Sequence, residues 1–510
     1  MSAIDAITLQ VLVGQLRSIC DEMGAVLIRS AHSANIKERR DCSTAVFDTR
    51  GELVMQAEHI PVHLGSMPDA VAAILGRQSS EGQTWILNDP FAGGTHLPDI
   101  TLITPVTTPG TGAALGFVAS RAHHADVGGP TPGSMPADSR SVVDEGVLIP
   151  ARTLDHPDDL RGLVAEMRNP AQRMADLRAQ WAANQIGRKR LIELVEGAAD
   201  DSGTLLEGMA AILDYSERRT RARFGELKDG TWEATDVLEG GMDGSDDVNL
   251  RVRVTLAGSE LAIDFTGSAG QVEGNLNCPL SVTRSAALFA VRVLVDPDAP
   301  PSAGAHRPIS VIAPEGSILN ARSPAAVAAG NVETSSRVAD LVLAALGEVT
   351  GGPAQGQGTM NNLTLAGRDR EWTHYETSGG GQGACPDAAG PDAIHVAMSN
   401  TLNTPVEALE TELPVLVREL AIRRGSGGAG RQPGGDGLIR EIEALEPIQF
   451  SLITERRRHA PSGRNGGDNG ARGRNLRNGV ELPAKARGTL APGDNLRIET
   501  PGGGGHGARN

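Results

Sequence analysis

The sequence has few cysteines, more acidic than basic residues and no long apolar run. Its 4 cysteines lie far apart without a CxxC pair, so neither a zinc ribbon nor a disulfide framework is indicated, and we expect a reducing, cytoplasmic location. The formal net charge of -16 argues against nucleic acid as a partner, because phosphate binding needs a positive surface. No run of about 18 apolar residues occurs, so we expect no transmembrane helix and no membrane partner.

Common nucleotide-binding and hydrolase motifs are also missing. There is no GxxxxGK[ST] P-loop, no GxSxG nucleophile elbow and no HExxH zinc motif. The glycine strings near residues 379, 427 and 502 lack the strand–helix setting of a dinucleotide site. The sequence therefore predicts no ATP site in this chain.

Glycine, in contrast, is abundant. The 63 glycines cluster in strings such as GGTH, GGGQG, GSGGAG and GGGGHG rather than in one linker. This distribution predicts tight turns and close backbone approaches inside an ordered protein.

Apolar periodicity predicts a mixed, multi-domain α+β protein with an N-terminal metal-site region and a β-rich C-terminal half. Helical spacing is clearest at residues 4–29, 170–197, 281–297 and 332–347, and strand-like alternation runs from 230 to 264. The expected divisions are an N-terminal α/β region (1–165), a helical segment (166–229), strands with buried helices (230–350) and a glycine-rich β region (351–510).

The most informative cluster of polar residues lies between residues 88 and 129. NDPFAGGTHLPD supplies Asp89, His96 and Asp99, and RAHHADVGG supplies two adjacent histidines followed by an aspartate. Each set is expected on a loop just past a strand, and two such loops can converge on one divalent ion. Imidazole and carboxylate together suit Zn, Mn, Fe or Co better than Ca or Mg. The alternative is that these aspartates cap loops and the histidines are merely hydrogen-bonded.

Two further groups have both structural and functional interpretations. His59 and His63 in AEHIPVHLG are spaced by four residues, but Pro61 interrupts any helix, so a place in the core or beside the site is favoured over a direct role. Arg39 and Arg40 belong to a charged run that is by default solvated, and the alternative is binding of a substrate carboxylate.

Ten ordered segments then show a resemblance to the hydantoinase B/oxoprolinase family, from about residue 3 to the C-terminus. They include SANIKERRDCSTAVFD, LNDPFAGGTHLPDI, HHADVGG, GNLNCPLSVTRSA, GNVETSSR and ETPGGGGHG. The resemblance implies the B component of an ATP-dependent cyclic-amide hydrolase, which acts on C–N bonds of a hydantoin or lactam. The implied partner is an actin-like hydantoinase A-type subunit that binds ATP and phosphorylates the substrate carbonyl, so that a hetero-oligomer is expected.

The resemblance also implies a ligand set. In acetone carboxylase relatives a manganese ion is held by a His-x-x-Asp pair and a later histidine, which matches His96, Asp99 and His123, with His124 as the rival third ligand. We therefore expect a divalent transition metal, Mn, Zn or Fe. Asp126 is expected as a ligand or as a partner that orients a ligand imidazole. Asp89 and His59 are expected beside the metal. Asp126, Asp89 and His59 are the catalytic candidates.

Two other functions remain open from the sequence. One is an acetone carboxylase-type alpha subunit, a ligase that carboxylates a phosphorylated enol. The other is a non-catalytic scaffold that stabilises the ATP-binding partner.

Overall fold

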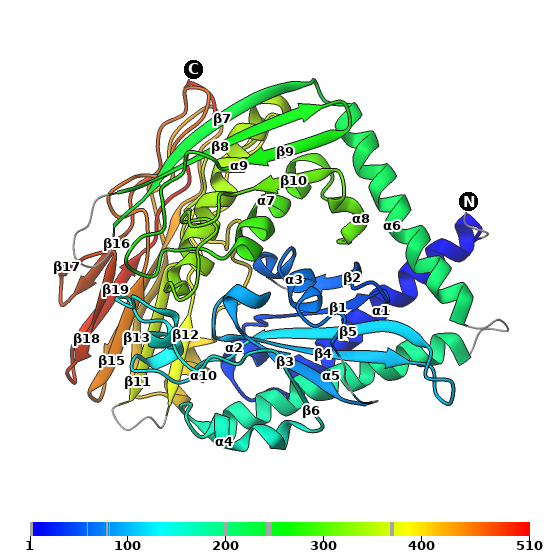
Figure 1. Cartoon of the computed structure of the whole chain (residues 1–510). Helices are drawn as coiled ribbons and strands as arrows, with labels where there is room; N and C mark the ends of the chain where they lie inside the picture. Colours follow the sequence, from blue (N-terminus) through cyan, green and yellow to red (C-terminus); the bar gives the residue numbers. More distant parts are fainter. Residues whose placement is uncertain are drawn as a thin grey trace.

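The computed structural model describes residues 4–58, 60–77, 80, 82–196, 202–240, 247–367 and 372–509. These residues form a mixed α+β structure with four β-sheets, which confirms the predicted fold class (Figure 1). The predicted domain boundaries stay predictions. The helices are α1 (Ala6–Ser30), α2 (Ala34–Lys37), α3 (Met67–Ala72), α4 (Arg161–Val164), α5 (Pro170–Glu196), α6 (Ser202–Gly225), α7 (Leu280–Val295), α8 (Ala303–His306), α9 (Ser335–Thr350) and α10 (Val406–Glu412).

No helix in the described part of the chain is both long and apolar enough to cross a membrane.

The N-terminal sheet has the strand order β2-β1-β5-β4-β3-β6, and all neighbouring strands are antiparallel. It carries both of the segments that hold the candidate metal ligands, and Figure 1 shows it in blue and cyan. Its strands are β1 (Cys42–Phe47), β2 (Leu53–Glu58), β3 (Thr84–Leu87), β4 (Asp99–Thr107), β5 (Ala114–His123) and β6 (Arg152–Leu154).

Helices cover both faces of this sheet. The Asp5 carboxylate caps α1 by accepting hydrogen bonds from the N–H groups of Ile7 and Thr8. The apolar face of α1, which includes Leu16 and Met23, is buried with α5 against β1, β2 and β5. Helix α3 packs on the opposite face in a separate apolar cluster. The sheet is therefore fixed by side-chain packing on both sides.

The middle of the molecule contains α7 and α9, which pack on each other and, through α9, on a second sheet (Figure 1). That sheet has the order β10-β9-β8-β7, and only its β9–β10 pair is parallel. The alternation predicted from residue 230 to 264 is confirmed here. The strands are β7 (Gly230–Leu238), β8 (Val248–Ala257), β9 (Glu260–Asp264) and β10 (Ile309–Ile312).

The C-terminal part forms two sheets that share an apolar core, with the orders β12-β11-β15-β18 and β13-β14-β19-β16-β17. The predicted β-rich character of this region is confirmed. The strands are β11 (Asn362–Gly367), β12 (Thr373–Glu376), β13 (Val415–Arg423), β14 (Gly437–Ala444), β15 (Ile448–Ile453), β16 (Arg474–Arg477), β17 (Val480–Leu482), β18 (Lys485–Leu490) and β19 (Asn495–Glu499).

The glycine strings pack against one another to form what we call the glycine layer, made of residues 379–383, 427–435, 463–470 and 502–505. Backbone hydrogen bonds link the strings, for example from Gly428 N–H to Gly503 O at 2.8 Å and from Gly503 N–H to Gly435 O at 2.9 Å. A Cβ added at Gly503 would collide with the carbonyl oxygen of Gln382. The close backbone approach predicted from the sequence is confirmed.

Candidate metal centre

The candidate site lies at the joined ends of β4 and β5. Asp99 is the first residue of β4 and His123 is the last residue of β5, and the two are direct cross-strand partners. The sequence had placed these residues on two loops past strand ends. The structure instead pairs them inside one antiparallel ladder, because the chain between β4 and β5 turns back directly and aligns their distal ends.

His96 reaches the same place from the loop that precedes β4. Two buried polar side chains hold this loop: the Asn88 amide donates to Leu97 O at 2.8 Å, and the Arg121 guanidinium donates to Gly93 O at 2.9 Å. Because Arg121 lies on β5, the strand that ends at His123 also fixes the approach of His96.

The three ligand atoms form a nearly equilateral triangle. His96 Nε2 lies 3.1 Å from His123 Nδ1 and 3.2 Å from Asp99 Oδ1. His123 Nδ1 and Asp99 Oδ1 are 3.1 Å apart. With metal–ligand bonds of about 2.1 Å, neighbouring ligand atoms are about 3.0 Å apart in octahedral and about 3.4 Å apart in tetrahedral coordination. The three separations are close to the octahedral value, so one cation could contact all three atoms. This buried group could therefore hold a metal ion.

The second oxygen of Asp99 is held away from the triangle. Thr95 Oγ1 donates to Asp99 Oδ2 at 2.5 Å, and His63 Nε2 lies 3.6 Å from the same oxygen. His63 is itself fixed by Ser43, whose Oγ lies 2.9 Å from His63 Nδ1. These contacts leave Oδ1 for the ligand position, and they give His63 the place beside the site that its sequence context favoured.

The electrostatics of the site suit a cation. Burial alone would raise the pKa of Asp99, but His96, His123 and His63 together hold it well below its usual value. Burial lowers the pKa of His123 and of His63. Metal binding requires an ionised carboxylate, and the lowered pKa of Asp99 favours that form.

His124 points to a different partner. Its Nε2 lies 2.8 Å from Oε1 of Gln180 on α5, and it does not belong to the triangle. Of the two adjacent histidines, the structure therefore brings His123, and not His124, to His96 and Asp99.

Asp126 and Asp89 organise backbone. Asp126 accepts hydrogen bonds from the N–H groups of Gly128 and Gly133 at 2.7 and 2.8 Å, and it forms a buried ion pair with Arg168 at 3.0 Å. Asp89 accepts from Phe91 N–H at 2.9 Å and so caps the short turn at residues 90–92. The described contacts of both aspartates lie outside the triangle. His59 lies outside the described residues.

The two candidate substrate-binding arginines differ in burial. Arg39 is fully buried, where it donates to Tyr375 O at 2.6 Å and to the hydroxyls of Thr377 and Thr401. Arg40 is exposed. Arg39 thus connects the N-terminal part to the segment around β12.

Two residues at the site carried no role in the sequence prediction. Asp41 is buried just before β1, and its carbonyl oxygen accepts a hydrogen bond from His123 N–H at 3.0 Å. Burial raises the pKa of Asp41, and the charge of His123 opposes that rise. Tyr375, from β12, stacks its ring on the ring of His123. Asp41 belongs to one of the segments that carry the family resemblance, whereas Tyr375 gives no local signal because its partner lies in a distant part of the sequence.

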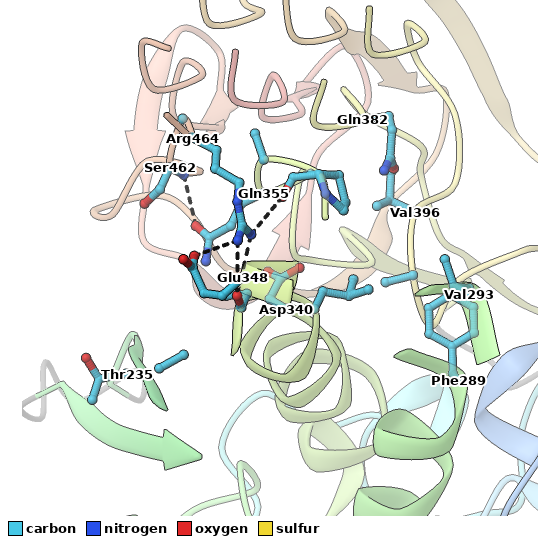
Figure 2. Close-up of a pocket in the computed structure, with 18 of the residues that line it drawn as sticks. Thr235, Phe289, Val293, Asp340, Glu348, Gln355, Gln382, Val396, Ser462 and Arg464 are labelled. Atoms are coloured by element: carbon cyan, nitrogen blue, oxygen red, sulfur yellow. Dashed lines mark hydrogen bonds and ion pairs between the residues drawn. The ribbon is translucent and has the colours of Figure 1, made fainter. Parts of the chain in front are cut away.

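A cavity of about 350 Å³ lies elsewhere, between α7, α9 and the glycine layer (Figure 2). Figure 2 shows Arg464 reaching Glu348 across one wall, at 2.6 Å, while Phe289 and Val293 form an apolar wall. Its lining residues do not include His96, Asp99 or His123. The buried ligand triangle and this cavity are therefore separate features of the described structure.

Comparison with known proteins gives one family. The family model described as hydantoinase B/oxoprolinase matches residues 5–509. The chain is 38% identical to 5-oxoprolinase 1 of Arabidopsis thaliana, over 99% of this chain but only 42% of that protein. It is 30% identical to a protein assigned as the B component of a D-/L-hydantoinase of Pseudomonas sp. (strain NS671), over 99% of this chain and 90% of that one.

Solved structures give the same picture. The ATP-dependent caprolactamase from Pseudomonas jessenii matches with a TM-score of 0.92 and 26% identity, covering 99% of this chain and 91% of that one. A nucleotide-free acetone carboxylase matches with a TM-score of 0.87 and 17% identity, covering 99% and 76%, and supports the fold alone.

Proposed function

The chain belongs to the hydantoinase B/oxoprolinase family, and from that premise we propose that it is the metal-bearing B component of an ATP-dependent cyclic-amide hydrolase. The observation that carries the proposal is the triangle of His96 Nε2, Asp99 Oδ1 and His123 Nδ1, with edges of 3.1 to 3.2 Å in a buried site. The caprolactamase and hydantoinase names of its relatives support a cyclic amide as substrate.

The reaction explains why two components are needed. A lactam carbonyl is a poor electrophile because the ring nitrogen donates electrons into it. An ATP-binding A-type partner would transfer a phosphoryl group to the carbonyl oxygen and release ADP. Water then attacks the activated carbon, the ring C–N bond breaks and the nitrogen takes up a proton, which leaves an acyl phosphate. A second water hydrolyses this acyl phosphate to a carboxylate and inorganic phosphate.

The residues of this chain would supply the second half of that reaction. His96, Asp99 and His123 would hold a divalent ion, which when bound lowers the pKa of a water ligand and polarises a carbonyl. Thr95 and His63 keep the Asp99 carboxylate turned toward the ligand position. Burial of all three ligand residues excludes bulk water, which strengthens the electrostatic interactions in the site.

The test is to co-express the chain with an A-type subunit and to measure ring opening and ADP together, with hydantoins and lactams as substrates. We expect His96→Ala and Asp99→Asn to lose bound metal and to abolish ring opening. His32→Ala, which changes an exposed histidine, is the matched control and should keep both. Full activity in the Ala and Asn variants would instead identify a scaffold, and bicarbonate-dependent product would identify a carboxylase.

A further inference from the structure

The imidazole of His123 lacks the hydrogen bond that usually orients a metal-binding histidine. Such a histidine normally donates its second ring N–H to a carboxylate or a carbonyl oxygen. Here Nδ1 faces Asp99 and His96, while Nε2 is buried and has no hydrogen-bond partner among the described residues. Something other than an edge hydrogen bond must therefore fix the plane of this ring.

The face of the ring provides the missing contact. The rings of His123 and Tyr375 are stacked, with centroids 4.7 Å apart and planes inclined by 16°. Parallel contact of this kind restricts rotation of the imidazole about its Cβ–Cγ bond, because rotation would drive one edge of the ring into the tyrosine ring. The stacking thus holds Nδ1 in the plane that reaches the other two ligand atoms.

Tyr375 is itself held at three points. Its hydroxyl donates to Asn362 Oδ1 at 2.7 Å, its carbonyl oxygen accepts from Arg39, and the Arg39 guanidinium carbon lies 5.1 Å from the ring centroid. The side chain of Asn362 is in turn fixed, since its amide donates to Glu333 Oε1 and to Ile453 O, both at 2.7 Å. The tyrosine is 2% exposed and has little freedom to move.

We propose that Tyr375 is the positioning residue for His123, so that the C-terminal sheet sets the ligand geometry of a metal centre built on the N-terminal sheet. The proposal rests on the proposed function, because it presumes that the triangle binds an ion. It also explains why a tyrosine serves here: the ring stacks on the ligand, and the hydroxyl anchors the ring to Asn362.

The first experiment compares metal binding by the purified full-length chain and its variants, with Co²⁺ as the probe. In Tyr375→Leu we expect the Co²⁺ dissociation constant to rise by about 10-fold or more and the visible absorption bands to shift, because the imidazole is no longer held. Tyr375→Phe keeps the ring and loses one hydrogen bond, so its constant should stay within about fivefold of the original, with unchanged bands. Tyr215→Leu, which changes the other tyrosine, on α6, should have no effect.

The outcomes separate the two proposals. An unaltered chain that binds no Co²⁺ overturns the metal site and this inference together. Tight binding by the unaltered chain, with equal affinity and identical bands in Tyr375→Leu, overturns the positioning role alone. If the leucine variant does not fold, Tyr375→Met takes its place, because methionine fills irregular space without a ring.

A second measurement needs no variant. The chain has 2 tyrosines, so isotope labelling of tyrosine gives NMR signals from two rings only. We expect paramagnetic Co²⁺ to shift and broaden the ring signals of Tyr375 and to leave those of Tyr215 in place. Unshifted Tyr375 signals in the Co²⁺-bound chain would show that its ring does not lie on His123 and would overturn the inference.

Discussion

The N-terminal sheet and the glycine layer achieve rigidity in opposite ways. The N-terminal sheet is covered on both faces by apolar side chains from α1, α5 and α3, and Asp99 and His123 at its strand ends meet His96 at one buried point. At the glycines of the glycine layer, main-chain groups lie in direct contact and are linked by hydrogen bonds. The first arrangement tolerates exchange of one apolar residue for another of similar size, whereas the second leaves no room for a side chain at tightly packed glycines such as Gly503.

The largest effect should come from a methyl group placed in the glycine layer. In Gly503→Ala the new Cβ meets the carbonyl oxygen of Gln382, and the neighbouring backbone cannot yield without breaking its own hydrogen bonds. We expect a loss of more than about 4 kcal/mol in the free energy of unfolding. Urea denaturation measures it, and a loss below about 1 kcal/mol would mean that the layer is less tightly packed than described.

A smaller effect should appear at the junction between α9 and the C-terminal sheet, where Glu333 is fully buried. Burial, and next to it the charge of Glu455, raises the pKa of Glu333 to about 8. The native state therefore keeps a proton that the unfolded state loses near pH 4 to 5, so that stability falls as the pH rises from there to about 8.

Glu333→Gln should remove this contribution to the pH dependence, which amounts to at most about 1.4 kcal/mol per pH unit. The measurement is the free energy of unfolding at pH 6 and pH 8 for the original chain and the variant. Glu315→Gln, an exposed glutamate, serves as the control and should keep the original slope. Equal slopes in the original chain and Glu333→Gln would contradict the assignment.

The smallest effect, of opposite sign, is expected on the N-terminal side. Gly14 is an exposed residue inside α1, and no atom lies within 4 Å of an added Cβ. Gly14→Ala should therefore stabilise the chain by about 0.5–1 kcal/mol, because alanine loses less backbone entropy in a helix. Thermal unfolding of Gly14→Ala and Gly503→Ala, measured together, tests the contrast between the N-terminal part and the glycine layer. Destabilisation by both substitutions would contradict this contrast.

The sequence predicted the mixed α+β class, the long helices and the family, because apolar periodicity and ordered motifs are local signals. It also identified His96, Asp99 and His123 as candidates, and the structure brings these three side chains together. The sequence did not decide between His123 and His124. Adjacent residues of a strand point to opposite faces of the sheet, but the sequence does not show at which residue this strand ends. Tyr375 could not be found either, because its contact with His123 depends on tertiary folding.

The alignment of Asp99 with His123 across β4 and β5 links ion binding to strand pairing. A slip of one residue between these strands would turn one of the two side chains to the other face and break up the donor set. An ion bound here would stabilise the one register of β4 and β5 in which Asp99 pairs with His123. A substitution that changes this register would therefore also remove the ion.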